Sequence, residues 1–354
     1  MRSELSPLSL GVMSFVLSLC VTPLQYPGFW LGSLGTAAVA APVAASLVGI
    51  AGTLVAARFA HQVGDVRAWR RGGGVFAVAL AAVVLAGGAE NMAIYARVAG
   101  AVQTTHFPLY YDVAFVLAGA AWAGYFGAEG AGRAVTTIFP LLVIGLAGVY
   151  VWPLGNVDAR NLFGPQPALA TGADLVTWTS LGVVRGYLVL LVWGGRVRDL
   201  KAACRAVLWG VSVAGALIAL SVVLSVAVFG LPEAVLLRYP FTAVTGTLHW
   251  QWFPTSSLEA LVMVVWQLVA FGTTAVYVAL ACDLLGAAWR GLDRRLALAA
   301  AGAAFALAGL DVPSSTIDVG AVAFNTGVLL VCLAVPGIWL LASSFRRAAP
   351  EGAA

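Results

Sequence analysis

The chain has 354 residues, of which 61% are hydrophobic and only 10% are charged. Soluble globular domains carry about 45–50% apolar and about 25% charged residues, so this composition excludes water-soluble enzymes, nucleic-acid-binding proteins and disordered scaffolds. The mean hydropathy of +0.95 agrees with that exclusion, and 40 glycines and 12 tryptophans are typical of membrane helices. The composition predicts a polytopic membrane protein.

The spacing of the cysteines and histidines does not indicate a disulfide framework or a metal site. The four cysteines have no CxxC spacing and mostly lie inside apolar runs, so we interpret them as small buried hydrophobic residues: Cys20, Cys204, Cys282 and Cys332. The three histidines, His61, His106 and His249, lie far apart and lack the spacing of metal ligands. The sequence therefore predicts neither a metal site nor a cofactor.

Ten segments are long and apolar enough to cross a bilayer, which takes roughly 20 residues each. In chain order they are about 8–27, 34–60, 75–96, 109–127, 134–152, 174–193, 206–230, 258–284, 296–310 and 320–342. The first run lacks the features of a cleavable signal and is interpreted as the first span. We expect a single all-α membrane domain over residues 1–354.

The basic residues predict the orientation, because cytoplasmic loops are enriched in Lys and Arg. Fifteen of the 19 fall on one side of the ten-span arrangement, and we expect that side and both termini to be cytoplasmic: Arg2, Arg58, Arg67, Arg70, Arg71, Arg133, Arg196, Arg198, Lys201, Arg205, Arg290, Arg294, Arg295, Arg346 and Arg347. Arg97, Arg160 and Arg238 fall on the other side, and Arg185 lies inside the sixth span.

Five spans that start inside and five that start outside make two halves of opposite topology, about 8–152 and 174–342. Transporters built from inverted repeats bind ligands near the bilayer midplane, at interruptions in the first helix of each repeat. Both first helices are rich in residues that interrupt a helix or expose hydroxyl groups: Ser14, Ser18, Thr22 and Pro23 in one, and Thr177, Thr179, Ser180, Gly182 and Gly186 in the other.

Several motifs follow one another along nearly the whole chain. They are a GxExxxR pattern from Gly127 through Glu129 to Arg133, then Phe139-Pro140, the stretch from Asp158 to Pro165, Tyr239-Pro240, and Glu259 followed seven residues later by Trp266. In order and spacing they resemble the spore-germination permease family, the integral-membrane B subunit of endospore germinant receptors. That family is part of the amino acid–polyamine–organocation superfamily, so the resemblance implies the ten-helix, LeuT-like inverted-repeat fold.

Three features depart from the family pattern, one of them an extra Gly164 in the Asn-Leu-x-Pro motif. Members usually have a glycine-rich break in the first helix, where this chain has Ser18-Leu19-Cys20-Val21-Thr22-Pro23, and an Asp where this chain has Glu259. The motif residues Glu129, Arg133 and Glu259 are candidate gate or subunit-contact residues. A solvated i,i+4 ion pair would equally explain the first two, and capping of a helix N-terminus would explain Glu259.

Arg185 is the most informative polar residue, because an arginine near the centre of a span costs about 2.5–3.5 kcal/mol. It needs an anion, and two are available: the carboxylate of a ligand, or Glu90 on the third span. The two interpretations are compatible, since a ligand could compete for the same guanidinium. The other candidate ligand-binding residues are Ser18, Thr22, Tyr95, Thr179, Ser180, Gly182, Trp266 and Thr273. Tyr95 and Trp266 would instead be interfacial or lipid-facing if they do not line a cavity.

Two functions of different classes follow. The first is the nutrient-sensing, permease-like subunit of a germinant receptor in the inner membrane of the spore. By resemblance, its partners would be a larger A subunit and a C-subunit lipoprotein, and its ligand a small germinant such as an amino acid. The second is an amino acid transporter coupled to protons or sodium. An intramembrane enzyme is not expected, since no nucleophile–base pair or metal cluster lies within the spans.

Overall fold

A computed structural model describes residues 5–65, 73–102, 109–163, 182–247, 259–289, 291–310 and 323–348. Every regular element in these ranges is a helix. The α-helices are α1 (Pro7–Leu19), α2 (Thr22–Leu34), α3 (Ala40–Val63), α4 (Gly73–Val102), α5 (Leu109–Tyr125), α6 (Gly127–Val151), α8 (Leu188–Trp193), α9 (Leu200–Phe229), α10 (Leu231–Ala234), α11 (Pro240–Gly246), α12 (Glu259–Ala288), α13 (Arg294–Gly309) and α15 (Val335–Ala348). Short 3₁₀ segments η1 (Gly35–Val39), η3 (Trp152–Asn156), η4 (Ala159–Phe163) and η5 (Gly194–Arg196) connect them, and η6 (Val328–Ala334) is π-helical.

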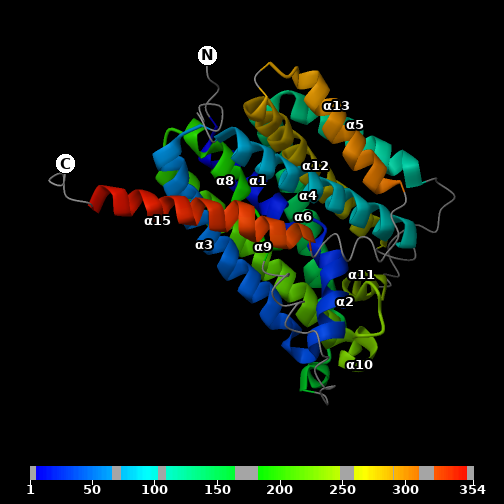
Figure 1. Ribbon diagram of the computed structural model, residues 1–354. Coiled ribbons are helices and arrows are strands. Elements are labelled where there is room, and N and C mark those ends of the chain that lie inside the picture. Colours follow the sequence, from blue (N-terminus) through cyan, green and yellow to red (C-terminus); the bar gives the residue numbers. More distant parts are fainter. Residues whose placement is uncertain are drawn as a thin grey trace, which may run out of the picture.

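The helices form one bundle around α12, which packs against α4, α5, α6, α13 and α1 (Figure 1). The central position of α12 leaves nearly all of its apolar window buried. On the other side of α1, a close contact with α9 is made possible by glycines: a Cβ on Gly11 would meet Ala206, and one on Gly210 would meet the backbone of Gly11. Small residues let membrane helices approach closely in this way.

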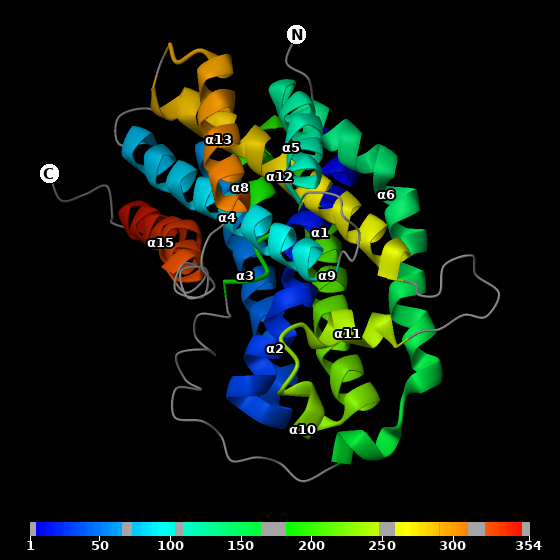
Figure 2. The ribbon, with the colours of Figure 1, turned by 90° about the vertical axis from the view of Figure 1, so that its right-hand side faces the viewer.

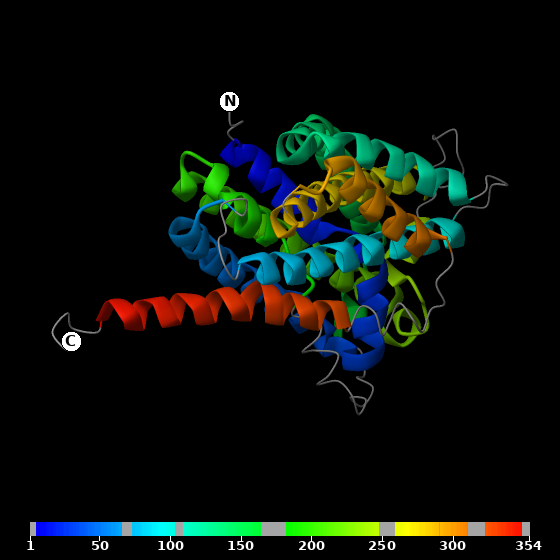
Figure 3. The same cartoon turned by 45° about the horizontal axis from the view of Figure 1, so that its top comes forward.

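Two helices lie at opposite edges of the bundle. Figure 2 shows α6 along one edge and α15 along the other. Figure 3 shows α15 crossing the outside of the bundle, with its C-terminal end projecting beyond the neighbouring helices. The span 323–344 is accordingly mostly unburied.

The described parts of the expected spans are helical, except for the break between α1 and α2 in the first and the irregular segment 182–187 in the sixth. Six helices are long and apolar enough to cross a membrane, and the bent pair α1–α2 makes a seventh. The helices α5 and α13, with 17 and 16 residues, lie at the expected fourth and ninth spans. Much of the sixth span falls outside the described residues, so the count of ten crossings and the orientation remain predictions.

The first span differs from its expected range, because its second half continues to Leu34 rather than ending near residue 27. Trp30 and Leu31 are buried against the bundle, and this packing carries the helix further than its hydropathy indicates. The stretch 231–257, which the topology predicts to lie outside, contains the short helices α10 and α11. Its aromatic cluster at Trp250, Trp252 and Phe253 lies outside the described residues.

Candidate functional site

Two helix breaks meet at the centre of the bundle. The first separates α1 from α2, which bend by 41° relative to each other, and its Cys20 has a φ of 46°, a left-handed conformation that is uncommon for a residue other than glycine. The second is the irregular segment 182–187 before α8. The amide of Gly186 donates to Ser18 Oγ at 2.9 Å, so the polar backbone freed at one break is satisfied by a side chain from the other.

A buried ion pair lies beside these breaks. Arg185 Nη1 donates to Glu90 Oε2 at 2.8 Å, and the two side chains are 1% and 5% exposed. The hydroxyl of Tyr26 donates to the other carboxylate oxygen at 2.8 Å, and Asn325 Nδ2 donates to Tyr26 Oη at 2.9 Å. The ring of Phe324 lies 4.5 Å from the guanidinium carbon of Arg185, which adds a cation–π contact. Residues from α2, α4, the irregular segment and the last span therefore share one charged centre.

A second polar chain runs from the first break to α12. The thiol of Cys20 donates to Asn91 Oδ1 at 2.8 Å, and Asn91 Nδ2 donates to Thr274 Oγ1 at 3.0 Å. Next to it, Thr273 Oγ1 donates to the carbonyl of Val16 at 3.0 Å. The interpretation of Cys20 as merely a small hydrophobic residue was incomplete, because its sulfur is a hydrogen-bonding partner.

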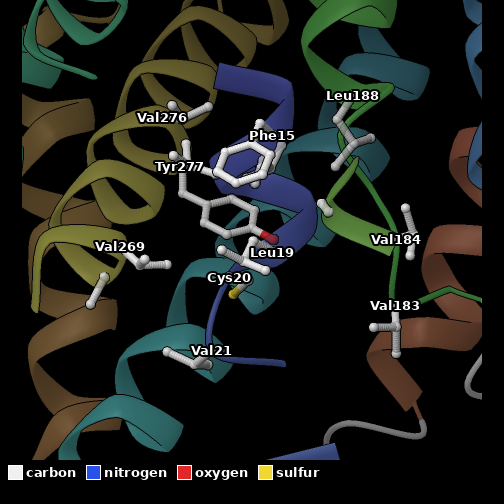
Figure 4. Close-up of a cluster of buried hydrophobic side chains, with 14 of the residues drawn as sticks. Phe15, Leu19, Cys20, Val21, Val183, Val184, Leu188, Val269, Val276 and Tyr277 are labelled. Atoms are coloured by element: carbon white, nitrogen blue, oxygen red, sulfur yellow. The ribbon is translucent and has the colours of Figure 1, made fainter. Parts of the chain in front are cut away.

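Several buried polar atoms near the charged centre have no hydrogen-bond partner among the described residues, including Arg185 Nε, Asn325 Oδ1 and the hydroxyls of Tyr187 and Tyr277. Figure 4 shows Tyr277 extending from α12 toward the break at Leu19 and Cys20, opposite Val183 and Val184 of the irregular segment. Most buried polar groups in proteins are paired. An unpaired donor, an unpaired acceptor and an unpaired hydroxyl at one centre can together form hydrogen bonds to a polar ligand.

The remaining predicted ligand-binding residues differ in burial and in their position relative to this centre. Ser18, Thr22, Trp266 and Thr273 are all fully buried or nearly so, which rules out the lipid-facing alternative for Trp266. A Cβ on Gly182 would overlap the backbone of Asn325, so this glycine lets the last span approach the break. Tyr95 is buried on α4, roughly 140° around the helix from Glu90. Thr179 and Ser180 lie outside the described residues, as does the side chain of Glu259.

Comparison with known proteins places this architecture in a family. The family described as spore germination protein matches residues 71–287. The chain belongs to this family. No curated protein sequence matches the chain, but the matched segment contains both Glu90 and Arg185.

Two solved structures share the fold of this chain. MHP1, a nucleobase-cation-symport-1 family transporter in a closed conformation with bromovinylhydantoin bound, aligns over 93% of this chain and 75% of its own at a TM-score of 0.60 and 14% identity. MhsT in complex with L-phenylalanine aligns over 94% and 89% at a TM-score of 0.57 and 14% identity. These likenesses show a transporter-like fold, and the long apolar helices make this member of the spore germination family an integral membrane protein.

Sequence reasoning missed three contributors to the charged centre: Tyr26, Phe324 and Asn325. Asn325 carries a usable signal, since it is an amide inside an otherwise apolar span. The aromatic residues carry none, because Tyr and Phe are common throughout membrane helices. The role of Tyr26 depends on the bend that turns α2 toward α4, and hydropathy does not reveal that bend.

A further ionic cluster near the C-terminal end of α12 was also missed. Asp283, whose carboxylate is fully buried, pairs with Arg196 Nη1 at 2.9 Å and with Arg294 Nη1 at 3.0 Å. The indole of Trp193 donates to the same carboxylate at 2.9 Å, and Arg196 also pairs with Asp65 at 3.2 Å. We call this end of the bundle the basic end. One buried acid thus connects the ends of α3, α8 and α12 to the start of α13.

The motif residues Glu129 and Arg133 pair with each other near the start of α6, as the i,i+4 spacing predicts. Their side chains are 37% and 78% exposed, so they take no part in the buried centre. The ion pair by itself contributes little to stability at this exposure.

Proposed function

We propose that this chain is the permease-like subunit of a spore germinant receptor in the inner membrane of the spore, and that it binds an amino acid at the charged centre. The observation that carries the proposal is the Arg185–Glu90 pair, held where two helix breaks meet in a member of the spore germination family. Ions are expensive to bury in a membrane. A buried pair at a broken-helix centre is therefore a strong candidate for ligand recognition.

The chemistry of the centre fits a zwitterion. A guanidinium binds a carboxylate through two parallel hydrogen bonds, and Arg185 Nε is available for one of them. Glu90 can accept from an ammonium group, and Asn325 Oδ1 offers a further acceptor. Because the pair is neutral as a whole, a ligand that is itself neutral overall can replace the internal ion pair by two ligand ion pairs without leaving a charge unpaired. The related-fold protein MhsT was solved with L-phenylalanine, a ligand of this class.

Ligand binding would then change the contacts that hold the last span. In the structure, Glu90 is bound through Tyr26 to Asn325, so an ammonium group that draws Glu90 away also alters the hydrogen bond to Asn325. We infer that this change biases a conformational equilibrium sensed by an A subunit and a C-subunit lipoprotein. Ser18, Thr22, Gly182, Trp266 and Thr273 would complete the surroundings of the ligand, together with Thr179 and Ser180.

Calorimetric titration of the purified protein with amino acids and their blocked derivatives tests the proposal. A germinant amino acid should bind, its amide should lose the contribution of Arg185, and its N-acetyl form should lose that of Glu90. Each lost charge-assisted bond is worth about 1.5–3 kcal/mol, which corresponds to a loss of tenfold or more in affinity. Equal binding of the blocked and free forms would show that the charged centre is not the ligand site.

A second candidate is a proton- or sodium-coupled amino acid transporter, which the fold favours because its solved neighbours are transporters. Glu90 would then exchange a proton, or backbone carbonyls freed at the breaks would hold sodium. Uptake of labelled amino acid into proteoliposomes separates the two functions. Concentrative uptake driven by a proton or sodium gradient would contradict the receptor-only proposal, whereas binding without accumulation would support it.

A further inference from the structure

A groove of about 680 Å³ opens at the basic end between α5, α6 and α12. These helices lie side by side in Figure 2 and pack on one another. The groove is apolar except at its mouth, and the residues that matter most are Trp122, Phe126, Glu129, Arg133, Ile138 and Phe271. The groove is lined by the Glu129–Arg133 motif, which the charged centre does not use.

The wall of the groove has exposed aromatic side chains, which suit contact with lipid rather than with water. Trp122 and Phe126 are 70% and 60% exposed, and their rings meet edge to face with centroids 5.7 Å apart. Aromatic residues gather where the hydrocarbon of a bilayer meets the headgroups. This pair therefore marks the depth of the headgroup layer, with the charged motif at the same level.

The apolar surface continues from the groove along α6 and α12. Ile138, Leu141 and Gly145 follow the three- and four-residue spacing of one helix face, as do Leu268 and Phe271 on the facing helix, and a second hollow includes Leu141, Gly145 and Leu268. From Arg133 to Ile144 the helix rises about 16 Å, close to the depth of one leaflet, which is about 15 Å. The surface thus has the length of a lipid chain below its headgroup.

The mouth of the groove offers one charge of each sign. Glu129 Oε1 accepts from Arg133 Nη2, which leaves the second carboxylate oxygen and other guanidinium N–H groups for a ligand. Arg133 matches a phosphate, and Glu129 matches an ammonium group. An anionic headgroup would satisfy the arginine but place its charge beside the carboxylate, whereas a headgroup with both charges satisfies both residues.

We propose that this groove binds a phospholipid whose headgroup carries a phosphate and a primary ammonium group, as in phosphatidylethanolamine. Arg133 binds the phosphate, Glu129 accepts from the ammonium, and one acyl chain follows the face of α6 past Ile138. A choline headgroup carries the same charges, but its quaternary nitrogen has no N–H to donate. Binding therefore selects for hydrogen bonding as well as for charge.

Native mass spectrometry of the purified full-length chain tests the proposal. Phosphatidylethanolamine, phosphatidylglycerol and phosphatidylcholine with identical acyl chains are each added in detergent, and the retained lipid is measured. The wild type should retain the ethanolamine lipid about tenfold more strongly than the other two, the effect of one charge-assisted hydrogen bond. Arg133→Gln and Glu129→Gln should each abolish this preference.

Two further variants test whether the lipid preference depends on Arg133 and on the groove itself. Arg205→Gln removes an exposed arginine near the start of α9, away from the groove. This variant should retain the three lipids as the wild type does. Thr137→Trp places a bulky ring at an exposed position of the groove and should reduce retention of all three lipids. Size-exclusion profiles confirm that each variant is folded.

Three outcomes would overturn the assignment. Equal retention of the three lipids by wild type and Arg133→Gln would mean that lipid only surrounds the protein. Retention of phosphatidylglycerol alone would make the groove a site for anionic lipid. Loss of phosphatidylethanolamine from the chain when it is purified with its receptor partners, together with cross-links from position 137 to a partner, would make the occupant a protein helix.

Discussion

Arg185 is held by contacts on several sides, and this makes its replacement informative. Its guanidinium pairs with Glu90 and lies against the ring of Phe324, so the side chain is fixed before any ligand arrives. Removing one partner of a buried ion pair costs about 3–5 kcal/mol, because the other charge remains buried. The two roles of Arg185, as a structural partner and as a ligand-binding group, therefore predict different mutant patterns.

We expect Arg185→Gln to abolish the germination response, and the double variant with Glu90→Gln to separate the two roles. If Arg185 only balances Glu90, the double variant should regain both protein abundance and response. If Arg185 binds the ligand, as proposed, the double variant should regain abundance and still fail to respond. Immunoblots of spore membranes and germinant dose–response curves provide both measurements. A normal dose–response in Arg185→Gln spores would remove this residue from the site.

A second prediction concerns the contact between the two breaks. A Cβ at Gly186 would overlap both the side chain and the carbonyl of Ser14, so Gly186→Ala should destabilise the protein by about 1–3 kcal/mol through overpacking. Gly302→Ala is the matched control, since that helical position has nothing within 4 Å of the added methyl group. Thermal unfolding of the detergent-solubilised variants measures the difference. An unchanged melting temperature for Gly186→Ala would mean that the breaks do not pack as described.

At the scale of elements, Asp283 determines how the helices are joined at the basic end. Its two oxygens are divided between Arg196 and Arg294, while Arg294 also donates to the carbonyl of Gly124 at 3.0 Å. The start of α1 joins the same cluster, because the amide of Leu5 donates to the carbonyl of Arg196 at 3.3 Å. Any opening of the bundle at this end must separate some of these groups.

We therefore expect Asp283→Asn to destabilise the protein by about 3 kcal/mol or more, since two arginines lose their shared carboxylate. Asp293→Asn is a close control. Asp293 is exposed and caps α13 by accepting from the amide of Arg295, and asparagine caps a helix about as well as aspartate. Melting temperatures of the two variants should differ clearly, and similar values would show that the Asp283 cluster contributes little to stability.

The elements were more accessible to sequence reasoning than the contacts between them. Hydropathy located the helices, and the cost of a buried arginine pointed from Arg185 to Glu90. The same reasoning did not find Tyr26 or Asn325, because their positions depend on the bend after Leu19 and on the backbone approach at Gly182. Asp283 was overlooked although it is an acid near the end of an apolar span. Such an acid needs cations, and Arg196 and Arg294 were nearby on the expected inner side.

For the whole molecule, the basic end gathers elements that lie far apart in the sequence. The starts of α1, α6 and α13 and the ends of α3 and α12 all meet there through the contacts of Arg196, Arg294 and Gly132. The Lys and Arg pattern predicts that this end of the bundle faces the cytoplasm.

Cysteine labelling in intact cells tests that sidedness. Cysteines introduced at Asn156 and Ser314 should react with a membrane-impermeant thiol reagent added outside, and one at Gly73 should not. The parent protein should carry Cys204→Ser, because the other three native cysteines are buried. Outside labelling at Gly73, or protection at both other positions, would contradict the ten-crossing arrangement with an inner N-terminus.

The π-helical stretch η6 lies between the charged centre and α15. Its hydrogen bonds join residues five apart rather than four, so it winds less tightly than the α-helices on either side. A shift of one residue to α-helical bonding would rotate everything beyond Ala334 by about 100°. Trp339 now packs on Phe59 with ring centroids 5.4 Å apart, and a rotation of that size would separate the two rings. The Phe59–Trp339 contact, about 20 Å along the helix from Asn325, is therefore the packing contact that a change of winding in η6 would break.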